Sequence, residues 1–231
     1  MPSARDVGRA VVRRLQPVAT SGPQAAGNLL RRILQTAIDG SSTFPGARAT
    51  AAKHLQRQDG RVGDAIESII DSHVRLGTAQ GFVTNLGGIA IAPVAIPANL
   101  AGVAIVQVRM IASIAHLRGY DIDDRRVRTA IVMCLLGGEQ IGHHVASGKL
   151  PTSPMAIATA PVFDPDLDAR VAETVLGALV TRVGGKHFPL MVTRRIPLLG
   201  GGVGALLDGM ATYQLGQFAK GELVRRRAIN S

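Results

Sequence analysis

Arg109 is the residue whose chemistry demands the most explanation, because it is the only charged residue between Arg75 and Arg118. An arginine in so apolar a segment must reach water, a lipid headgroup or a carboxylate. Asp208 is a lone acid inside a glycine-rich segment and is its natural partner. The sequence therefore predicts either a buried Arg109–Asp208 ion pair or two separately solvated charges.

Four further polar residues are candidates for holding a ligand or an acidic headgroup. Ser113 and His116 follow Arg109 on the same face of an expected helix. His73 and Gln80 lie on one stripe of the helix that begins at Val62. For His73 the alternative is a core histidine whose polar atoms are satisfied by neighbours, since buried polar groups usually find partners.

Signatures of catalysis and of metal binding are weak in this sequence. Glu139 and His143 are four residues apart, but the ligand count falls short of a metal site. The run from Gly200 to Gly204 lacks the Lys-Ser/Thr of a phosphate-binding loop and instead predicts close helix packing. We expect no metal and no cofactor. An enzyme that uses His73, His116 or Glu139 remains an alternative.

Composition describes an apolar, basic chain of 231 residues: 46% hydrophobic, 18% charged, with a net charge of +10. That balance excludes intrinsic disorder, and one cysteine excludes a disulfide framework. Aromatic residues at 3% supply few platforms for nucleic-acid bases, so nucleic acid is not an expected partner. Residues 1–61 hold ten Lys or Arg against three Asp or Glu, a net of +7, which favours an anionic partner.

Hydrophobic periodicity predicts an all-α fold, a multi-helix bundle around a Gly/Ala-rich apolar helical hairpin. The expected helices cover 5–15, 29–38, 47–58, a segment from 62, then 82–91, 97–118, 125–145, 165–183 and a glycine-rich segment after 197. Residues 40–46 and 147–165 are expected to be connectors. We divide the chain into basic amphipathic helices over 1–60 and a helical domain over 61–231.

The basic N-terminal helices are the expected membrane-surface contact. Their candidate residues are Arg5, Arg9, Arg13, Arg14, Arg31 and Arg32. Each Lys or Arg near an anionic leaflet contributes about 1 kcal/mol.

The hairpin over 77–118 is the most apolar part of the chain, and residues 77–108 carry no charge. It can form the core or insert partly in a bilayer. Full spanning is not expected, because the arm over 82–91 has about 10 residues against the roughly 20 that a span needs.

Several short motifs within residues 60–220 resemble the EcsC protein family of bacteria, in an actinobacterial-type version. They are QGF at 80–82, QVRMIASIA at 107–115, GYD at 119–121 and PLLGG at 197–201. The family is named after a gene that lies beside the two components of an ABC exporter. The resemblance implies an all-α, membrane-proximal accessory protein and carries over no catalytic residue.

Together these observations predict a non-enzymatic protein on the cytoplasmic, inner face of the plasma membrane. Its expected partners are anionic lipid, an ABC transporter or another membrane protein, and a second copy of the chain. The alternative is a soluble helical bundle that binds a lipid or other hydrophobic ligand in an internal cavity.

Overall fold

The computed structural model describes residues 23–41, 44–86, 92–190 and 197–224. Within these ranges the side chains of 23–27, 78–86, 92–100, 180, 182–190 and 197–208 are outside the description. The described ranges form an all-α bundle, as expected, with one two-stranded sheet. The elements are α2 (Pro23–Asp39), β1 (Gly40–Ser41), β2 (Phe44–Pro45), α3 (Ala47–Arg57), α4 (Val62–Leu86), α5 (Ala92–Leu117), α6 (Arg125–Cys134), α7 (Gly138–Ala146), α8 (Pro154–Ala158), α9 (Pro165–Leu190) and α10 (Pro197–Glu222).

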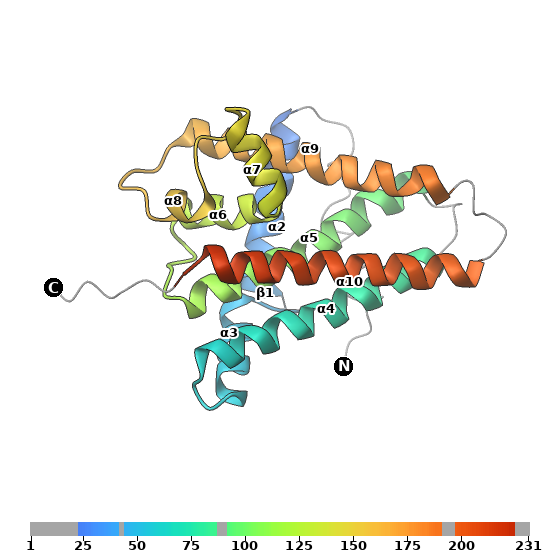
Figure 1. Cartoon of the computed structure of the whole chain (residues 1–231), viewed down its shortest axis with the longest axis horizontal. Coiled ribbons are helices and arrows are strands. Elements are labelled where there is room, and N and C mark those ends of the chain that lie inside the picture. The colour runs from blue at the N-terminus through green and yellow to red at the C-terminus, as the bar shows by residue number, and fades with distance from the viewer. Residues whose placement is uncertain (1–22, 42–43, 87–91, 191–196, 225–231) are drawn as a thin grey trace.

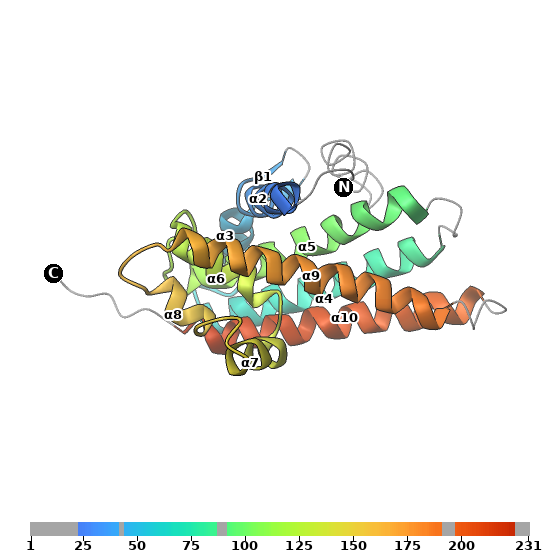
Figure 2. The ribbon, with the colours of Figure 1, turned by 90° about the horizontal axis from the view of Figure 1, so that it is seen from above.

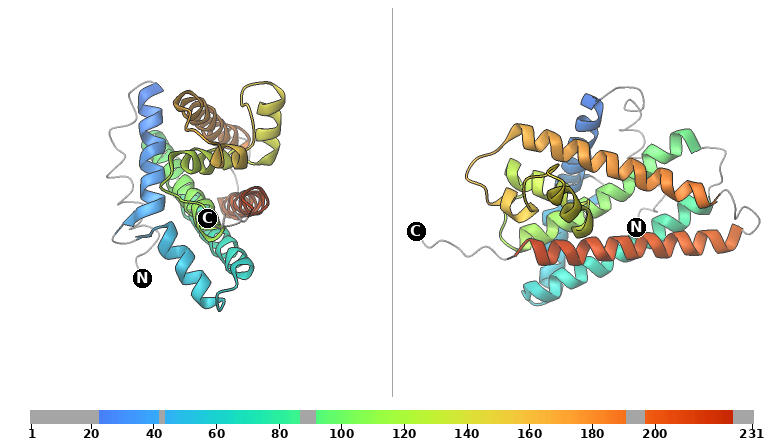
Figure 3. Two further views of the ribbon diagram at one scale, coloured as in Figure 1. Left: turned by 90° about the vertical axis from the view of Figure 1, so that its left-hand side faces the viewer. Right: turned by 45° about the horizontal axis from the view of Figure 1, so that its top comes forward.

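The four long helices α4, α5, α9 and α10 run along the long axis of the molecule (Figure 1). Helices α4 and α10 lie side by side, and α5 packs against α4. Seen from above, α2 and α3 lie along one edge of the bundle and α7 along the opposite edge (Figure 2). The end-on view in Figure 3 shows the same separation. The bundle therefore has an α2–α3 side and an α7 side.

Helix α5 forms the centre of the core. From Ala104 to Ala115 every residue is buried, so this part of the uncharged hairpin packs inside the protein. Leu30, Ile33 and Ile38 of α2 belong to the same buried cluster as α5. Helices on both sides of the expected boundary at 60–61 therefore share one core. No helix within the described residues is both long and apolar enough to cross a membrane.

A glycine sets the closest approach of α10 to the core. A Cβ atom on Gly216 would lie 2.9 Å from Ile70 Cγ1 and 3.2 Å from Met110 Sδ. We call this contact of Gly216, Ile70 and Met110 the Gly216 crossing. Any side chain at Gly216 would therefore push α10 away from α4 and α5.

The hairpin differs from its expected boundaries. The expected separate helix over 82–91 is wrong in that α4 runs without a break from Val62 to Leu86. Helix α5 begins at Ala92, not at Pro97, so the expected turn over 93–97 is wrong as well. Pro93 falls in the first helical turn, where its missing N–H has no intrahelical partner to lose.

Two other boundaries were misplaced. The expected single helix over 125–145 is two helices, broken where Gly137 adopts φ 79°, a conformation that favours glycine. Helix α9 continues through Gly184 and Gly185 to Leu190, so this glycine pair does not end it. The expected connector over 147–165 contains the short helix α8. The expected start of α9 at residue 165 is confirmed, and Asp164 caps it by accepting hydrogen bonds from the backbone N–H groups of Asp166 and Leu167.

The segment 40–46, expected to be a loop, forms the tight β1–β2 hairpin. Gly40 adopts φ 80°, and a Cβ there would lie 2.4 Å from Gly46 N. A Cβ on Gly46 would lie 2.3 Å from Ile38 O. Only glycine fits at both positions, and the pair turns the chain so that Phe44 and Pro45 face α5.

Candidate functional site

Arg109 is the buried centre of the candidate site, with 4% of its surface exposed. Its Nε donates to His73 Nε2 at 3.1 Å, and one terminal nitrogen donates to the Pro45 carbonyl at 3.3 Å. Its guanidinium carbon lies 3.7 Å from the centre of the Phe44 ring, a cation–π contact. Arg109 thus ties α5 to α4 and to the β1–β2 hairpin.

His73 accepts that hydrogen bond because its other nitrogen is a donor. Nδ1 lies 2.7 Å from the Ile69 carbonyl, which can only accept, so the proton is on Nδ1 and Nε2 is free to accept from Arg109. Burial and the charge of Arg109 lower the pKa of His73 to about 3. The imidazole is therefore neutral at physiological pH, as the contact with a cation requires.

Arg109 keeps its charge without an acidic partner among the described side chains. Burial lowers its pKa to about 10, which leaves it protonated near neutral pH. No described carboxylate lies within ion-pair distance of it. Its loss of hydration is compensated by two dipoles, those of the His73 imidazole and the Pro45 carbonyl, and by the quadrupole of the Phe44 ring. Neither Arg109 nor His73 exchanges a proton near pH 7, which argues against an acid–base role for this pair.

A second branch extends the site toward α3. His54 on α3 is buried, and its ring nitrogens lie 2.9 Å from Ser68 Oγ and 3.5 Å from Ser72 Oγ. Burial, then the charges of Arg57, Lys53 and Arg109, lower the pKa of His54. Its contacts join α3 to the face of α4 that also carries His73.

Ser113, one turn after Arg109, completes the contact between α5 and α3. Its hydroxyl lies 3.0 Å from the Ala47 carbonyl and 2.7 Å from the Arg109 carbonyl. We call the set Pro45, His54, Ser72, His73, Arg109 and Ser113 the Arg109 junction. All its members except Ser72 and Pro45 are buried. The junction fixes α3 and the β1–β2 hairpin onto α4 and α5.

The structure brings together only some of the predicted site residues. His73, Arg109 and Ser113 belong to the junction, whereas His116 is exposed near the end of α5 and Glu139 is exposed on α7. No contact in the described part of the chain joins His73, His116 and Glu139. The side chains of Gln80 and Asp208 lie outside the description, so the Arg109–Asp208 pair stays a prediction.

Three residues at this site, Phe44, Pro45 and His54, were not predicted from the sequence. The partners of His54 on α4 are Ser68 and Ser72. Their i, i+4 spacing could have indicated a polar stripe on this helix. Nothing local pointed to Phe44 and Pro45. Among the described residues there is no cluster of three side chains suited to a metal ion. Cys134 is fully buried, and burial raises the pKa of its thiol.

The α2–α3 side carries the exposed positive charge. Residues 23–57 hold five Lys or Arg and one acid, Asp39, a net of +4. We call its exposed cations the basic layer; they are Arg31, Arg32, Arg48, Lys53 and Arg57. Arg48 is paired with Asp123. The apolar residues of α2 from Leu30 to Ile38 face inward, so among its described side chains α2 presents polar and charged groups to the outside. Arg5, Arg9, Arg13 and Arg14 lie outside the described residues.

A concavity among the described residues lies elsewhere. It is an open groove of about 520 Å³ between α7 and α9, and none of the Arg109 junction lines it.

Comparisons with known proteins found no neighbour. No protein-family model matches the chain, and neither the curated proteins nor the solved structures contain a match.

Proposed function

We propose that the protein is a non-enzymatic accessory protein that docks on an anionic membrane surface through its basic layer. The supporting observation is the segregation of charge: the α2–α3 side has a net of +4 over residues 23–57. Residues 119–170, which include α6–α8, hold five Lys or Arg against seven Asp or Glu, a net of −2. Such a charge distribution orients the α2–α3 side toward an anionic surface.

The geometry of α2 favours attraction by charge over insertion. Leu30, Ile33 and Ile38 are buried against the core, and Arg31 is exposed on the other side of the helix. An inserting helix would have to give its apolar face to the lipid. Here that face is already occupied, so binding must depend on salt, because exposed charges are screened over about 10 Å at 0.1 M.

The Arg109 junction has a supporting role in this proposal. It holds α3, which carries Lys53 and Arg57, in a fixed position on α4 and α5. The basic layer is therefore a rigid surface rather than a set of independent side chains, and that reduces the entropy lost when it binds.

Vesicle flotation of the full chain tests the proposal. The variant Arg31→Glu/Lys53→Glu/Arg57→Glu reverses three charges of the basic layer. We expect the wild type to float with vesicles containing phosphatidylglycerol and not with pure phosphatidylcholine. Loss of three attractions of about 1 kcal/mol each weakens partitioning by about 100-fold.

Arg170→Glu is the single-charge control, because Arg170 is exposed on α9 and is not a member of the basic layer. It reverses one charge elsewhere on the molecule and should leave flotation within about twofold of wild type, since the attraction of a charge to the lipid falls off within a Debye length. Equal binding to neutral vesicles, or loss of binding in Arg170→Glu alone, would show that the basic layer is not the docking surface.

A further inference from the structure

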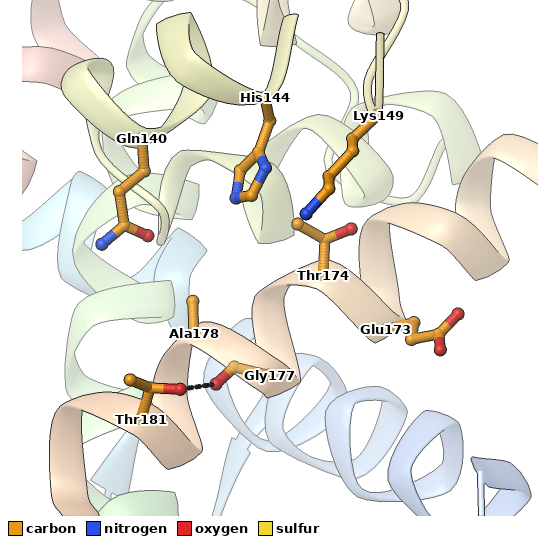
Figure 4. A pocket seen from close by; sticks show the side chains of 8 residues that line it. All are labelled: Gln140, His144, Lys149, Glu173, Thr174, Gly177, Ala178 and Thr181. Carbon is orange, nitrogen blue, oxygen red and sulfur yellow. Dashed lines mark hydrogen bonds between the residues drawn. The ribbon is translucent and has the colours of Figure 1, made fainter. Parts of the chain in front are cut away.

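The groove between α7 and α9 presents polar groups that the protein itself does not satisfy. Gln140, His144 and Lys149 extend from one wall toward Thr174, Ala178 and Thr181 on α9 (Figure 4). The Nδ1 atom of His144 is buried and has no hydrogen-bond partner among the described residues. A buried polar atom left unpaired is costly, and it marks a place where a ligand can bind.

The charges in the groove are also unpaired. No described acid lies within ion-pair distance of Lys149, although Glu173 lines the same groove. Figure 4 shows Glu173 directed away from His144 and Lys149. The groove therefore holds an exposed ammonium group and an imidazole whose Nδ1 has no hydrogen-bond partner among the described residues.

The surrounding hydrogen bonds limit which groups can meet a ligand. The hydroxyls of Thr174 and Thr181 donate to carbonyls of their own helix, at 2.7 and 2.8 Å. The His143 and His144 carbonyls at the end of α7 accept backbone N–H groups from residues 147–150. The donors left for a ligand are Lys149, His144 and the Gln140 amide. Lys and protonated His donate and never accept, so they are suited to an anion.

We propose that this groove binds a small anion, a phosphate or carboxylate group, between His144 and Lys149. Gln140 adds a neutral donor from the preceding turn of α7. The small residues Gly177 and Ala178 of α9 leave room for the group, and a Cβ on Gly177 would meet nothing within 4 Å. This site contains no residue of the basic layer and does not depend on the membrane proposal.

The protonation of His144 offers a direct readout. Burial, then Lys149 and His143, lower the pKa of His144. The acid that lines this groove, Glu173, points away from it. A bound anion would stabilise the imidazolium and so raise the pKa of His144. His143 is exposed and does not line the groove, but its ring centre lies 5.8 Å from that of His144, so we expect it to respond less than His144 does.

NMR of the histidine ring signals in the full chain tests the proposal, with inorganic phosphate and acetate as probes over the millimolar range. We expect a saturable shift of the His144 signal, an upward change in its pKa, and a smaller response at His143, whose ring contacts that of His144. Lys149→Met should weaken binding about tenfold, the effect of one charge pair at short range. His143→Gln is the matched control and should bind as the wild type does.

Two comparisons decide the outcome. A shift caused by phosphatidylglycerol vesicles and also by free phosphate identifies the phosphate group as the ligand, whether free or in a headgroup; a shift with acetate and not phosphate identifies a carboxylate. Absence of a saturable His144 shift with both probes, or equal affinity in Lys149→Met, overturns the proposal. Because the variant of Arg31, Lys53 and Arg57 should still bind phosphate, failure of this site is distinguishable from failure of membrane docking.

Discussion

The Arg109 junction and the Gly216 crossing are both buried contacts of α4, but they are built from opposite kinds of residue. At the junction, α4 meets α3 and α5 through imidazoles, a guanidinium and hydroxyls. At the crossing it meets α10 through a glycine, an isoleucine and a methionine. One contact depends on the pairing of every polar group, the other on the close approach of the α10 backbone to the side chains of Ile70 and Met110.

The two contacts therefore have different roles: the junction determines how the helices are positioned, and the crossing contributes packing energy. Polar pairs at the junction tolerate one arrangement only, because a shift of one turn would leave Arg109 or His73 buried without a partner. The crossing gains its energy from apolar area, and Lys220 and Gln217 of α10 bind Glu67 at its edge. We infer that the junction sets the register of α3, α4 and α5, and that the crossing supplies stability.

Removing Arg109 should have the largest effect. Arg109→Ala leaves His73 Nε2 and the Pro45 carbonyl without their donor and opens a cavity, so we expect unfolding free energy to fall by about 3 kcal/mol or more. Arg109→Met keeps the stem and removes the cost of burying a charge, so its effect should be about half as large. Urea unfolding at pH 7 measures both, and a change below about 0.5 kcal/mol for Arg109→Ala would mean that its contacts contribute nothing net.

Acid should destabilise the junction through His73. Its pKa is 6.5 when unfolded and about 3 when folded, so the unfolded chain binds more protons between these values. The stability from neutral His73 is complete above pH 6.5 and is lost as the pH falls toward 3.

The matched comparison is His73→Gln, whose amide can donate to Ile69 and accept from Arg109 without titrating. Between pH 7 and pH 5 the wild type should lose about 1–2 kcal/mol more stability than His73→Gln, by urea unfolding. His54 and Glu67 also make both proteins less stable as the pH falls, because folding lowers the pKa of each of these groups. Their contribution is the same in the two proteins and cancels in the comparison. Parallel pH profiles for the two proteins would show that His73 is not buried as a neutral group.

Two glycines of α10 should respond to alanine in opposite directions. Gly216→Ala places a Cβ against Ile70 and should cost about 1–2 kcal/mol after the gain in helix propensity. Gly221→Ala meets nothing within 4 Å and should stabilise by about 0.5–1 kcal/mol. Thermal unfolding separates the two, and adding Ile70→Ala should remove most of the Gly216→Ala penalty; equal effects at both positions would contradict close packing at the crossing.

Periodic patterns predicted the all-α fold and the burial of His73, because a 3.6-residue stripe depends only on local sequence. The boundaries were less predictable. Gly184 and Gly185 were expected to end α9, but the helix continues to Leu190, and tertiary context commonly overrides the weak cost of glycine. Gly137 breaks a helix because its φ is positive, which no pattern of hydrophobic residues encodes.

The partners of Arg109 could not be predicted from sequence. Phe44 and Pro45 reach it only because Gly40 and Gly46 fold the β1–β2 hairpin back onto α5, across 64 residues of chain. The sequence pointed to Asp208 because a carboxylate is the usual partner of a buried arginine. Among the described residues, its partners are an imidazole, a backbone carbonyl and an aromatic ring, each of which stabilises a buried guanidinium, and the pair with Asp208 stays a prediction.

The pairing of α4 with α10 also has a consequence for synthesis. Gln217 and Glu67 are separated by 150 residues, so α4 leaves the ribosome long before its partner exists. At about 5–20 residues per second, α10 follows roughly 8–30 s later. During that interval the face of α4 that carries Ile70 has no α10 to cover it. The packing of α4 can be completed only after α10 has been synthesised.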